Sequence, residues 1–331
     1  MANSSESAED RLIARYFRPL ARHEGAFGLA DDAAALTVPP GCDLVLTTDG
    51  VIAGVHFFPD DPPQDIARKA LRMNLSDLAA KGAKPVGFLI AVALTKETDE
   101  AWLAAFARGL GEDAEHYGCP LLGGDTDHTP GPVSVSIAAF GVVPHGAMVR
   151  RATAKAGDRI VVTGTIGDAA LGVRLRGDAS LGARWRLLEP MQAHLLQRYL
   201  LPQPRTALAE AVQHHATASI DVSDGLAGDL AKLCRASSVA AEVDVERVPL
   251  SEAARTAVTA EPALIETLLT GGDDYEIILT LAPDKLAAFG SAAQAAGVSI
   301  TEIGRMQAGE GARFLQDGTP LTFARPSYSH F

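Results

Sequence analysis

Residues 86–94 read VGFLIAVAL, an almost unbroken apolar run in a chain of 331 residues. Such a run predicts a central strand of a sheet. A helix is predicted before it, beginning at the Pro62-Pro63 pair, because proline is tolerated in a first turn, and ending by Gly82. A second helix is predicted over residues 99–116. The run therefore lies between two helices, as in layered α/β proteins.

Strand and helix signals continue to alternate along the chain, which predicts α/β or α+β domains. Further strands are expected at 43–48, 133–143, 160–163, 219–221 and 277–281, and further helices at 8–21, from 168 onward and at 224–236. The composition changes over Arg150–Asp158, and the length suits two domains. We place these domains at residues 1–146 and 147–331.

Composition narrows the class of protein. The chain is 47% hydrophobic and 21% charged, which is typical of a globular protein. A net charge of −12 disfavours nucleic acid as a partner. We expect no membrane span, since no apolar run reaches about 18 residues. Cys42, Cys119 and Cys234 form no C-x-x-C pair, and the N-terminus is acidic, so we expect neither a disulfide framework nor a secretory signal, but a cytoplasmic protein.

Aspartates stand beside glycines repeatedly, at places where a strand or helix is expected to end. These places are Asp31-Asp32, Asp49-Gly50, Gly123-Gly124-Asp125, Asp221 with Asp224-Gly225, and Gly271-Gly272-Asp273-Asp274. Carboxylate oxygens on tight loops suit Mg²⁺, which commonly shares its ligands with substrate phosphates. Bound metal would also reverse the local negative charge and attract phosphate. The pattern predicts a phosphoryl-transfer site with several metal ions, assembled from loops.

Each motif taken singly also has a simpler interpretation. Ser223 or Asp224 could cap the following helix. Asp77 could be a solvated helix residue, Arg151 part of a solvated linker, and His56 a structural hydrogen-bonding residue. No G-x-x-x-x-G-K-[ST], protein-kinase or Rossmann signature is present, so a nucleotide would need a different cradle.

The order of the motifs is more specific than any one of them. They are D-D-A near residue 31, T-T-D at 47, G-V-H-F at 54, N-L-S-D-L-A-A-K-G-A at 74, G-G-D-T at 123, D-V-S-D-G-L at 221 and G-G-D-D-Y-E at 271. From about residue 8 to the final S-H-F, the chain resembles the thiamine-monophosphate kinase family. The resemblance implies transfer of the ATP γ-phosphoryl group to thiamine monophosphate, giving thiamine diphosphate. It also implies a PurM-like fold, with an N-terminal mixed-sheet domain that dimerises and binds ATP and metal, and a C-terminal α+β domain.

The resemblance also implies roles for individual residues, with several Mg²⁺ ions and ATP as co-substrate. Metal ligands are expected at Asp32, Thr47, Thr48, Asp49, Asp77, Asp125, Asp221 and Asp224, of which Asp49, Asp125 and Asp221 are also the expected catalytic residues. ATP contacts are expected at Gly124, Arg151, Ser223 and Tyr117, and substrate contacts at His56, Asp273 and Tyr328. The chain departs from the family pattern at Ala30, Gly50 and Asp273. The expected partners are thiamine monophosphate, ATP and a second copy of the chain.

We expect direct in-line transfer without a phosphoenzyme, since such a step needs positioning and charge neutralisation more than covalent chemistry. Other ATP-using members of the superfamily are alternatives, among them aminoimidazole ribonucleotide synthetase. Selenophosphate synthetase would need a reactive cysteine near the N-terminus, whereas the first is Cys42, and the hydrogenase-maturation dehydratase would need one at the C-terminus, where the sequence is Ser329-His330-Phe331. A nucleotide or metal sensor without turnover is the alternative from another class.

Overall fold

A computed structural model describes residues 7–325 and 327, and the chain divides into two compact units. The first unit takes the residues up to Leu78 and Lys84–Gly146. The second takes Ala79–Ala83 and the residues from Ala147 onward. The short excursion into the second unit has no counterpart in the sequence-based expectations.

The first unit is built on a four-stranded sheet with strand order β1-β4-β2-β3. Its strands are β1 Cys42–Ile52, β2 Lys84–Leu94, β3 Leu121–His128 and β4 Ser134–Pro144. β2 and β3 are parallel, whereas β4 is antiparallel to both β1 and β2. The sheet is therefore mixed, as expected, with the predicted central strand inside it.

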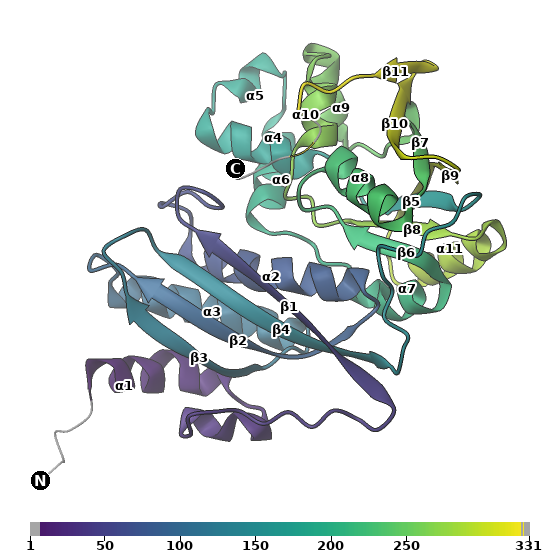
Figure 1. Ribbon diagram of the computed structural model, residues 1–331. Helices are drawn as coiled ribbons and strands as arrows, with labels where there is room; N and C mark the ends of the chain where they lie inside the picture. The colour runs from purple at the N-terminus through teal and green to yellow at the C-terminus, as the bar shows by residue number, and fades with distance from the viewer. Residues whose placement is uncertain (1–6, 326, 328–331) are drawn as a thin grey trace, which may run out of the picture. The chain divides into compact units, whose positions relative to one another are not determined.

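Helices α2 Pro63–Ala80 and α3 Glu100–His116 cover one face of this sheet (Figure 1). Strand residues alternate between the two faces, and those on the helix side, such as Val51 and Ile90, are buried. The opposite face leaves Leu46 64% exposed and Leu89 36% exposed. We call this the open face of the sheet.

The N-terminal residues are helical from Ala8 to Leu20, as expected, but form three short segments, the last of which contains Pro19, a residue that cannot continue an α-helix. They are α1 Ala8–Leu12, η1 Ile13–Phe17 and η2 Arg18–Leu20, and a further turn, η3, spans Glu24–Leu29. Arg15 Nη1 lies 2.8 Å from Glu100 Oε2, which joins this region to the start of α3. η3 contacts β3.

The second unit contains a seven-stranded sheet with order β11-β10-β7-β9-β5-β8-β6. Its strands are β5 Arg159–Thr163, β6 Ala216–Asp221, β7 Ala240–Asp244, β8 Ile277–Leu281, β9 Ile300–Gln307, β10 Gly311–Gln316 and β11 Thr319–Leu321. Among the described strands of this second sheet, only β7 and β10 pair in parallel.

Helices cover both faces of the second sheet. They are α4 Asp168–Gly177, α5 Leu181–Arg184, α6 Glu189–Leu200, α7 Ala209–His215, α8 Leu226–Ser237, α9 Glu252–Ala260, α10 Leu264–Thr270 and α11 Leu286–Ala295, with short turns η4 Thr206–Leu208, η5 Val245–Arg247 and η6 Pro283–Lys285. α8 packs on the face that carries Ile160, and α7 and α11 pack on the face that carries Val161. A third apolar cluster joins α4, α5, α6, α9 and α10 around Trp185. The unit is α+β, as predicted.

The excursion Ala79–Ala83 is attached to this second core. Ala79 and Ala80 are fully buried among residues that include Val212 and Phe289. Lys81 Nζ donates to the Ser219 carbonyl oxygen at 2.9 Å, and Ser219 Oγ donates to the Ala80 carbonyl oxygen. Buried contacts and hydrogen bonds thus attach these five residues to the second unit, although residues of the first unit flank them in sequence.

Two expectations about strand ends are wrong. Asp49-Gly50 lies inside β1, where Asp49 pairs with Ile137, and Gly124-Asp125 lies inside β3, where Asp125 pairs with Ala91. Partner strands continue past these residues and supply their backbone hydrogen bonds, so the turn preference of Gly and Asp is overridden. No helix of the described residues has the length and apolar character needed to cross a membrane.

Candidate active site

Three predicted metal ligands lie on the helix-covered side of the first sheet. Thr47 and Asp49 are two positions apart on β1 and therefore share a face. Thr47 Oγ1 donates to Asp77 Oδ2, on α2, at 2.5 Å. The backbone N–H of Asp49 donates to Asn74 Oδ1 at 3.0 Å. One turn of α2 thus holds Asn74 and Asp77 against β1, and Asp77 is not the solvated helix residue of the simpler interpretation.

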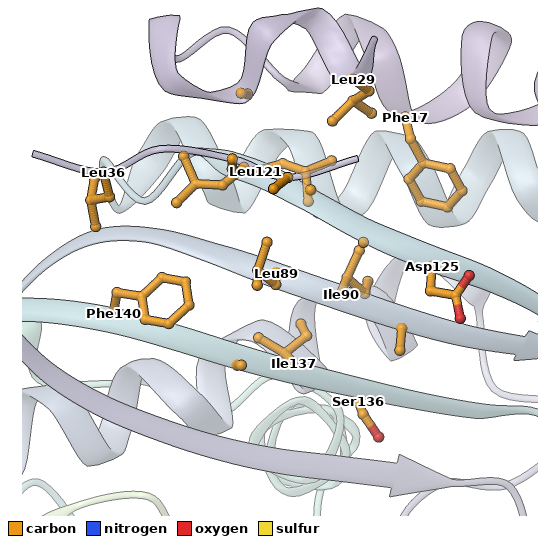
Figure 2. Close-up of a pocket in the computed structure, with 18 of the residues that line it drawn as sticks. Phe17, Leu29, Leu36, Leu89, Ile90, Leu121, Asp125, Ser136, Ile137 and Phe140 are labelled. Atoms are coloured by element: carbon orange, nitrogen blue, oxygen red, sulfur yellow. The ribbon is translucent and has the colours of Figure 1, made fainter. Parts of the chain in front are cut away.

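Three further predicted ligands line a pocket of about 820 Å³ on the open face, namely Asp32, Thr48 and Asp125. Strand register explains this grouping, because Asp125 lies in the same row across the sheet as Ala91, Ser136 and Gly50. The pocket floor is apolar and includes Leu89 and Phe140, while Asp125 lies toward one end (Figure 2). The structure therefore separates the predicted ligands of the first unit into two groups on opposite faces.

Neither group is a closed metal cage. Within residues 7–325 and 327, no three His, Cys, Asp or Glu side chains are arranged to hold a metal ion. The donors that are present are carboxylate and hydroxyl oxygens, the ligand type that Mg²⁺ prefers. Mg²⁺ is usually held by one or two carboxylates, water and substrate phosphates. The donor set therefore fits Mg²⁺ bound together with a phosphate ligand.

Gly124, a predicted ATP contact, also lines the pocket, but its glycine has a structural cause. A Cβ at this position would lie 2.1 Å from the carbonyl oxygen of Ile90 on the neighbouring strand. We expected the missing side chain to let a ligand come close to the backbone, but it instead lets Gly124 pack closely against Ile90 of the neighbouring strand. The backbone of Gly124 remains part of the pocket wall.

Tyr117 and His56 lie outside the pocket lining. Tyr117 ends α3, and its ring centroid lies 5.6 Å from Cζ of Arg72, a distance at which a guanidinium stabilises an aromatic ring. His56 Nδ1 accepts the N–H of Ile52 at 3.1 Å, and the His56 carbonyl accepts Lys69 Nζ at 3.0 Å. These bonds hold the ring and backbone of His56 in place, as the structural interpretation foresaw, and its expected contact with substrate stays a prediction. A neutral ring that accepts at Nδ1 keeps its proton on Nε2.

In the second unit, Asp221 ends β6 as predicted and is buried. The following turn is organised by Asp229, whose Oδ2 accepts the N–H groups of Ser223 and Asp224 at 2.9 and 2.8 Å. Neither Ser223 nor Asp224 caps α8, since its N-cap is Gly225 without a side-chain bond. The capping interpretation is therefore wrong.

Asp229 is itself fully buried, and burial raises the pKa of its carboxyl. Lys232 opposes this effect, with its Nζ 2.7 Å from Asp229 Oδ1, and also pairs with Asp224. Sequence reasoning missed both residues. The signal was an aspartate inside a predicted helix, a position that aspartate occupies with poor propensity unless it has a partner.

The predicted substrate contact Asp273 lies beside this turn. Its N–H donates to the Ser223 carbonyl at 3.0 Å, and the N–H of Tyr275 donates to the Val222 carbonyl at 2.9 Å. A Cβ on Gly272 would lie 2.2 Å from the Ser223 oxygen, so only glycine permits this approach. The structure thus brings Ser223 and Asp273 together.

Two predicted site residues, Arg151 and Tyr328, are not placed in either group of ligands described above. Arg151 is exposed, and its carbonyl accepts Ser237 Oγ at 2.8 Å. Tyr328 lies outside the described residues. Ser327 is described, and its Oγ lies 3.4 Å from the Asp224 carbonyl oxygen.

The sequence matches two family models along most of its length. They are "AIR synthase related protein, N-terminal domain", over residues 30–143, and "AIR synthase related protein, C-terminal domain", over residues 155–316. The two sheets, each with its helical layer, thus define a two-domain AIR synthase related protein. The thiamine-monophosphate kinase of Caulobacter vibrioides is 44% identical over 322 residues, which cover 96% of this chain and 89% of that protein. The chain belongs to the thiamine-monophosphate kinase family.

Solved structures agree with this assignment. The thiamine-monophosphate kinase of Stenotrophomonas maltophilia K279a superposes with a TM-score of 0.82 at 38% identity, covering 94% of this chain and 96% of that one. A structure described as "AaThiL complexed with AMPPCP and TMP" gives a TM-score of 0.76 at 30% identity, covering 93% and 97%. The predicted family and PurM-like fold are confirmed.

Proposed function

We propose that this protein catalyses the ATP-dependent phosphorylation of thiamine monophosphate to thiamine diphosphate. The observation that carries the proposal is 44% identity to a thiamine-monophosphate kinase over 96% of the chain. The related structure with AMPPCP and TMP supports it, because AMPPCP is an ATP analogue whose terminal phosphoryl group cannot be transferred. A donor analogue and an acceptor bound together fit a direct transfer between them.

Mg²⁺ is part of the proposal. The carboxylates of Asp32 and Asp125 and the hydroxyl of Thr48, which share the pocket on the open face, would hold metal at the phosphate end of the nucleotide. Asp49 and Asp77 offer a second carboxylate pair on the helix-covered face, and Asp221 and Asp224 a third in the second unit. Bound Mg²⁺ would neutralise charge on two phosphate groups that otherwise repel each other.

The roles of the remaining residues are proposed from the family resemblance, and the chemistry of their side chains suits those roles. Gly124 and Ser223 offer backbone and hydroxyl groups to the nucleotide, and Arg151 offers a planar donor for phosphate. The Asp273 carboxylate suits the cationic or amino groups of thiamine, with His56 and Tyr328 as further substrate contacts. The acceptor phosphate is already an anion, so no strong general base is needed. We therefore propose in-line transfer without a phosphorylated enzyme.

We also propose a homodimer formed through the open face of the first sheet. Leu46 and Ile52, which lie outside the pocket lining on that side of the sheet, are 64% and 38% exposed, and apolar side chains grouped on one surface favour association. A cytoplasmic location is proposed from the three cysteines, none of which is in a disulfide.

The decisive experiment mixes the purified protein with ATP, Mg²⁺ and thiamine monophosphate and separates the products by chromatography. We expect thiamine diphosphate from the monophosphate and none from free thiamine. Asp221→Asn should abolish product, whereas Asp284→Asn, at an exposed site in the same unit, should not. ATP binding without product would favour a sensor or another superfamily substrate. Radiolabel from ATP retained on the denatured protein would refute direct transfer.

A further inference from the structure

The segment Gly271–Glu276 has an unusual backbone conformation. Asp273 has φ 73° and Tyr275 has φ 50°, although neither residue is a glycine. A left-handed conformation is disfavoured for residues with a Cβ and persists where the surrounding structure enforces it. The two residues that alternate with them, Asp274 and Glu276, are both fully buried.

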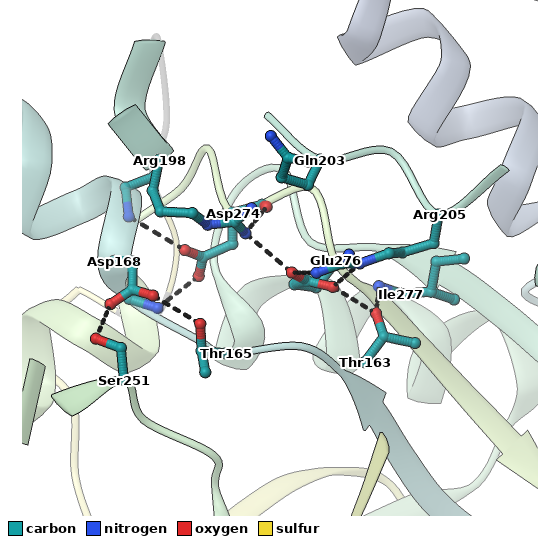
Figure 3. A network of polar contacts seen from close by, with 12 residues as sticks. Thr163, Thr165, Asp168, Arg198, Gln203, Arg205, Ser251, Asp274, Glu276 and Ile277 are labelled. Atoms are coloured by element: carbon teal, nitrogen blue, oxygen red, sulfur yellow. Dashed lines mark hydrogen bonds and ion pairs between the residues drawn. The ribbon is translucent and has the colours of Figure 1, made fainter. Parts of the chain in front are cut away.

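The first anchor of the segment is the carboxylate of Glu276. Arg198 Nη2 donates to Oε1 at 2.9 Å, and Arg205 Nε donates to Oε2 at 2.6 Å, with a second bond from Arg205 Nη2 to Oε1. Thr163 Oγ1 donates to Oε2 at 2.7 Å and accepts the N–H of Ile277 at 2.8 Å. We call Glu276, Arg198, Arg205 and Thr163 the Glu276 cluster (Figure 3).

The second anchor is Asp274, which lies two residues before Glu276 in the same network. Its Oδ2 accepts the N–H of Gly167 at 2.7 Å, and its Oδ1 accepts the N–H of Ala169 at 3.4 Å. Arg198 Nη2 also donates to the Asp274 carbonyl at 3.1 Å. Arg198 thus joins both anchors, and the intervening Tyr275 has little freedom to leave its left-handed conformation.

The anchored segment in turn fixes its neighbour. The N–H of Val222 donates to the Glu276 carbonyl at 2.8 Å, and the carbonyls of Val222 and Ser223 accept from Tyr275 and Asp273. A shift of Glu276 would therefore move both segments of this pairing. One segment carries Asp273, and the other carries Ser223.

A buried charged cluster is an inefficient way to stabilise a fold, because desolvation of the charges offsets their attraction. Its advantage is directional, since a bidentate guanidinium fixes a carboxylate in one orientation. We propose that Glu276, clamped by Arg198 and Arg205, is a positioning residue that sets the place of the Asp273 carboxylate relative to Ser223. The inference rests on the proposed function and deepens it. It adds Glu276, Arg198 and Arg205, which are not among the proposed contacts to substrate or nucleotide.

The test compares Arg205→Met and Arg205→Lys with the parent protein, and uses Arg159→Met as a matched control. Arg159 belongs to the same sheet and pairs with Glu302 at 3.3 Å on the surface, away from the cluster. Steady-state kinetics give kcat and both KM values at a temperature where each variant is folded. Hydrogen exchange is followed separately in peptides that cover residues 219–226, 270–277 and 240–244.

We expect Arg205→Met to lower kcat/KM for thiamine monophosphate by about ten- to a hundredfold, as for a group misplaced by about 1 Å. Arg205→Lys should be intermediate, since it keeps the charge but not the planar fork. Exchange should accelerate in 219–226 and 270–277 but not in 240–244, and Arg159→Met should resemble the parent.

Parent-like kinetics and exchange in Arg205→Met would overturn the proposal, as would an activity loss that only follows the folded fraction. If Arg205→Met does not fold, Arg205→Lys decides by the same two measurements. If the parent itself makes no thiamine diphosphate, the proposed function fails, while the exchange comparison still supports or overturns the positioning role.

Discussion

Asp229→Ala should destabilise the second unit and disorder the turn that carries Ser223 and Asp224. The carboxylate accepts two backbone N–H groups and pairs with Lys232. Each N–H left without a partner costs about 1–3 kcal/mol when buried. The substitution also removes the ion pair with Lys232. Because 29% of the Lys232 side chain is exposed, it can turn toward solvent, and the lost pair adds little to the decrease in stability.

Ser223 and Asp224 are only half-buried, so we take the lower part of that range for each donor and expect a loss of about 3 kcal/mol in unfolding free energy. For a unit of this size, 1 kcal/mol corresponds to about 2–4 °C in melting temperature, so the expected decrease is about 6–12 °C. Scanning calorimetry and urea unfolding measure these quantities directly.

Asp284→Ala provides the control, because Asp284 is an exposed aspartate of the same unit. It should change the unfolding free energy by less than about 0.5 kcal/mol. A loss below 1 kcal/mol in Asp229→Ala would refute the argument, since it would mean that water or another residue satisfies both N–H groups at no cost.

Three further variants test other features. Gly272→Ala should raise KM for thiamine monophosphate and lower the unfolding free energy by about 1–3 kcal/mol, because its Cβ would lie 2.2 Å from the Ser223 oxygen. Gly290→Ala on α11 should be neutral or stabilising, and equal effects of the two substitutions would contradict the argument. Leu46→Glu should convert the dimer to a monomer in sedimentation, while Leu188→Glu, at a site that is 65% exposed in the second unit, should not; an unchanged dimer would exclude the open face as the interface. Burial raises the pKa of Asp274 well above its ordinary 3.8, so the stability that its protonated form contributes is complete below pH 3.8 and is lost as pH rises through the folded-state pKa. Asp274→Asn should flatten the decline of unfolding free energy with rising pH, measured by urea unfolding. A pH profile identical to that of the parent would show that Asp274 does not cause the decline.

The sequence predicted elements best where the local pattern and the pairing agree. Residues 277–281 are apolar throughout, and β8 has those bounds. Around Asp49 and Asp125, local chemistry indicated turns, but antiparallel or parallel neighbours extend both strands. The strand partner of Asp49 is Ile137 and that of Asp125 is Ala91, both far along the chain, and a local pattern does not reveal such partners.

The same limit applies to the candidate site. Asp221 and Asp273 were located by their local motifs, and both stand at the ends of paired segments. That Thr47 and Thr48 face opposite sides of one sheet follows from strand alternation once β1 is known to continue. Arg198 and Arg205 have no motif of their own, and their partner Glu276 lies more than seventy residues further along.

The excursion of Ala79–Ala83 has a consequence for synthesis of the chain. A ribosome completes residues 1–146 before it makes Val212 or Phe289, against which Ala79 and Ala80 pack. During that interval the end of α2 has emerged without its permanent neighbours, so α2 can finish folding only after much of the second unit has been translated. A gene cut after Gly146 would make that interval permanent, and the two halves would need to be co-expressed for either to reach its native packing.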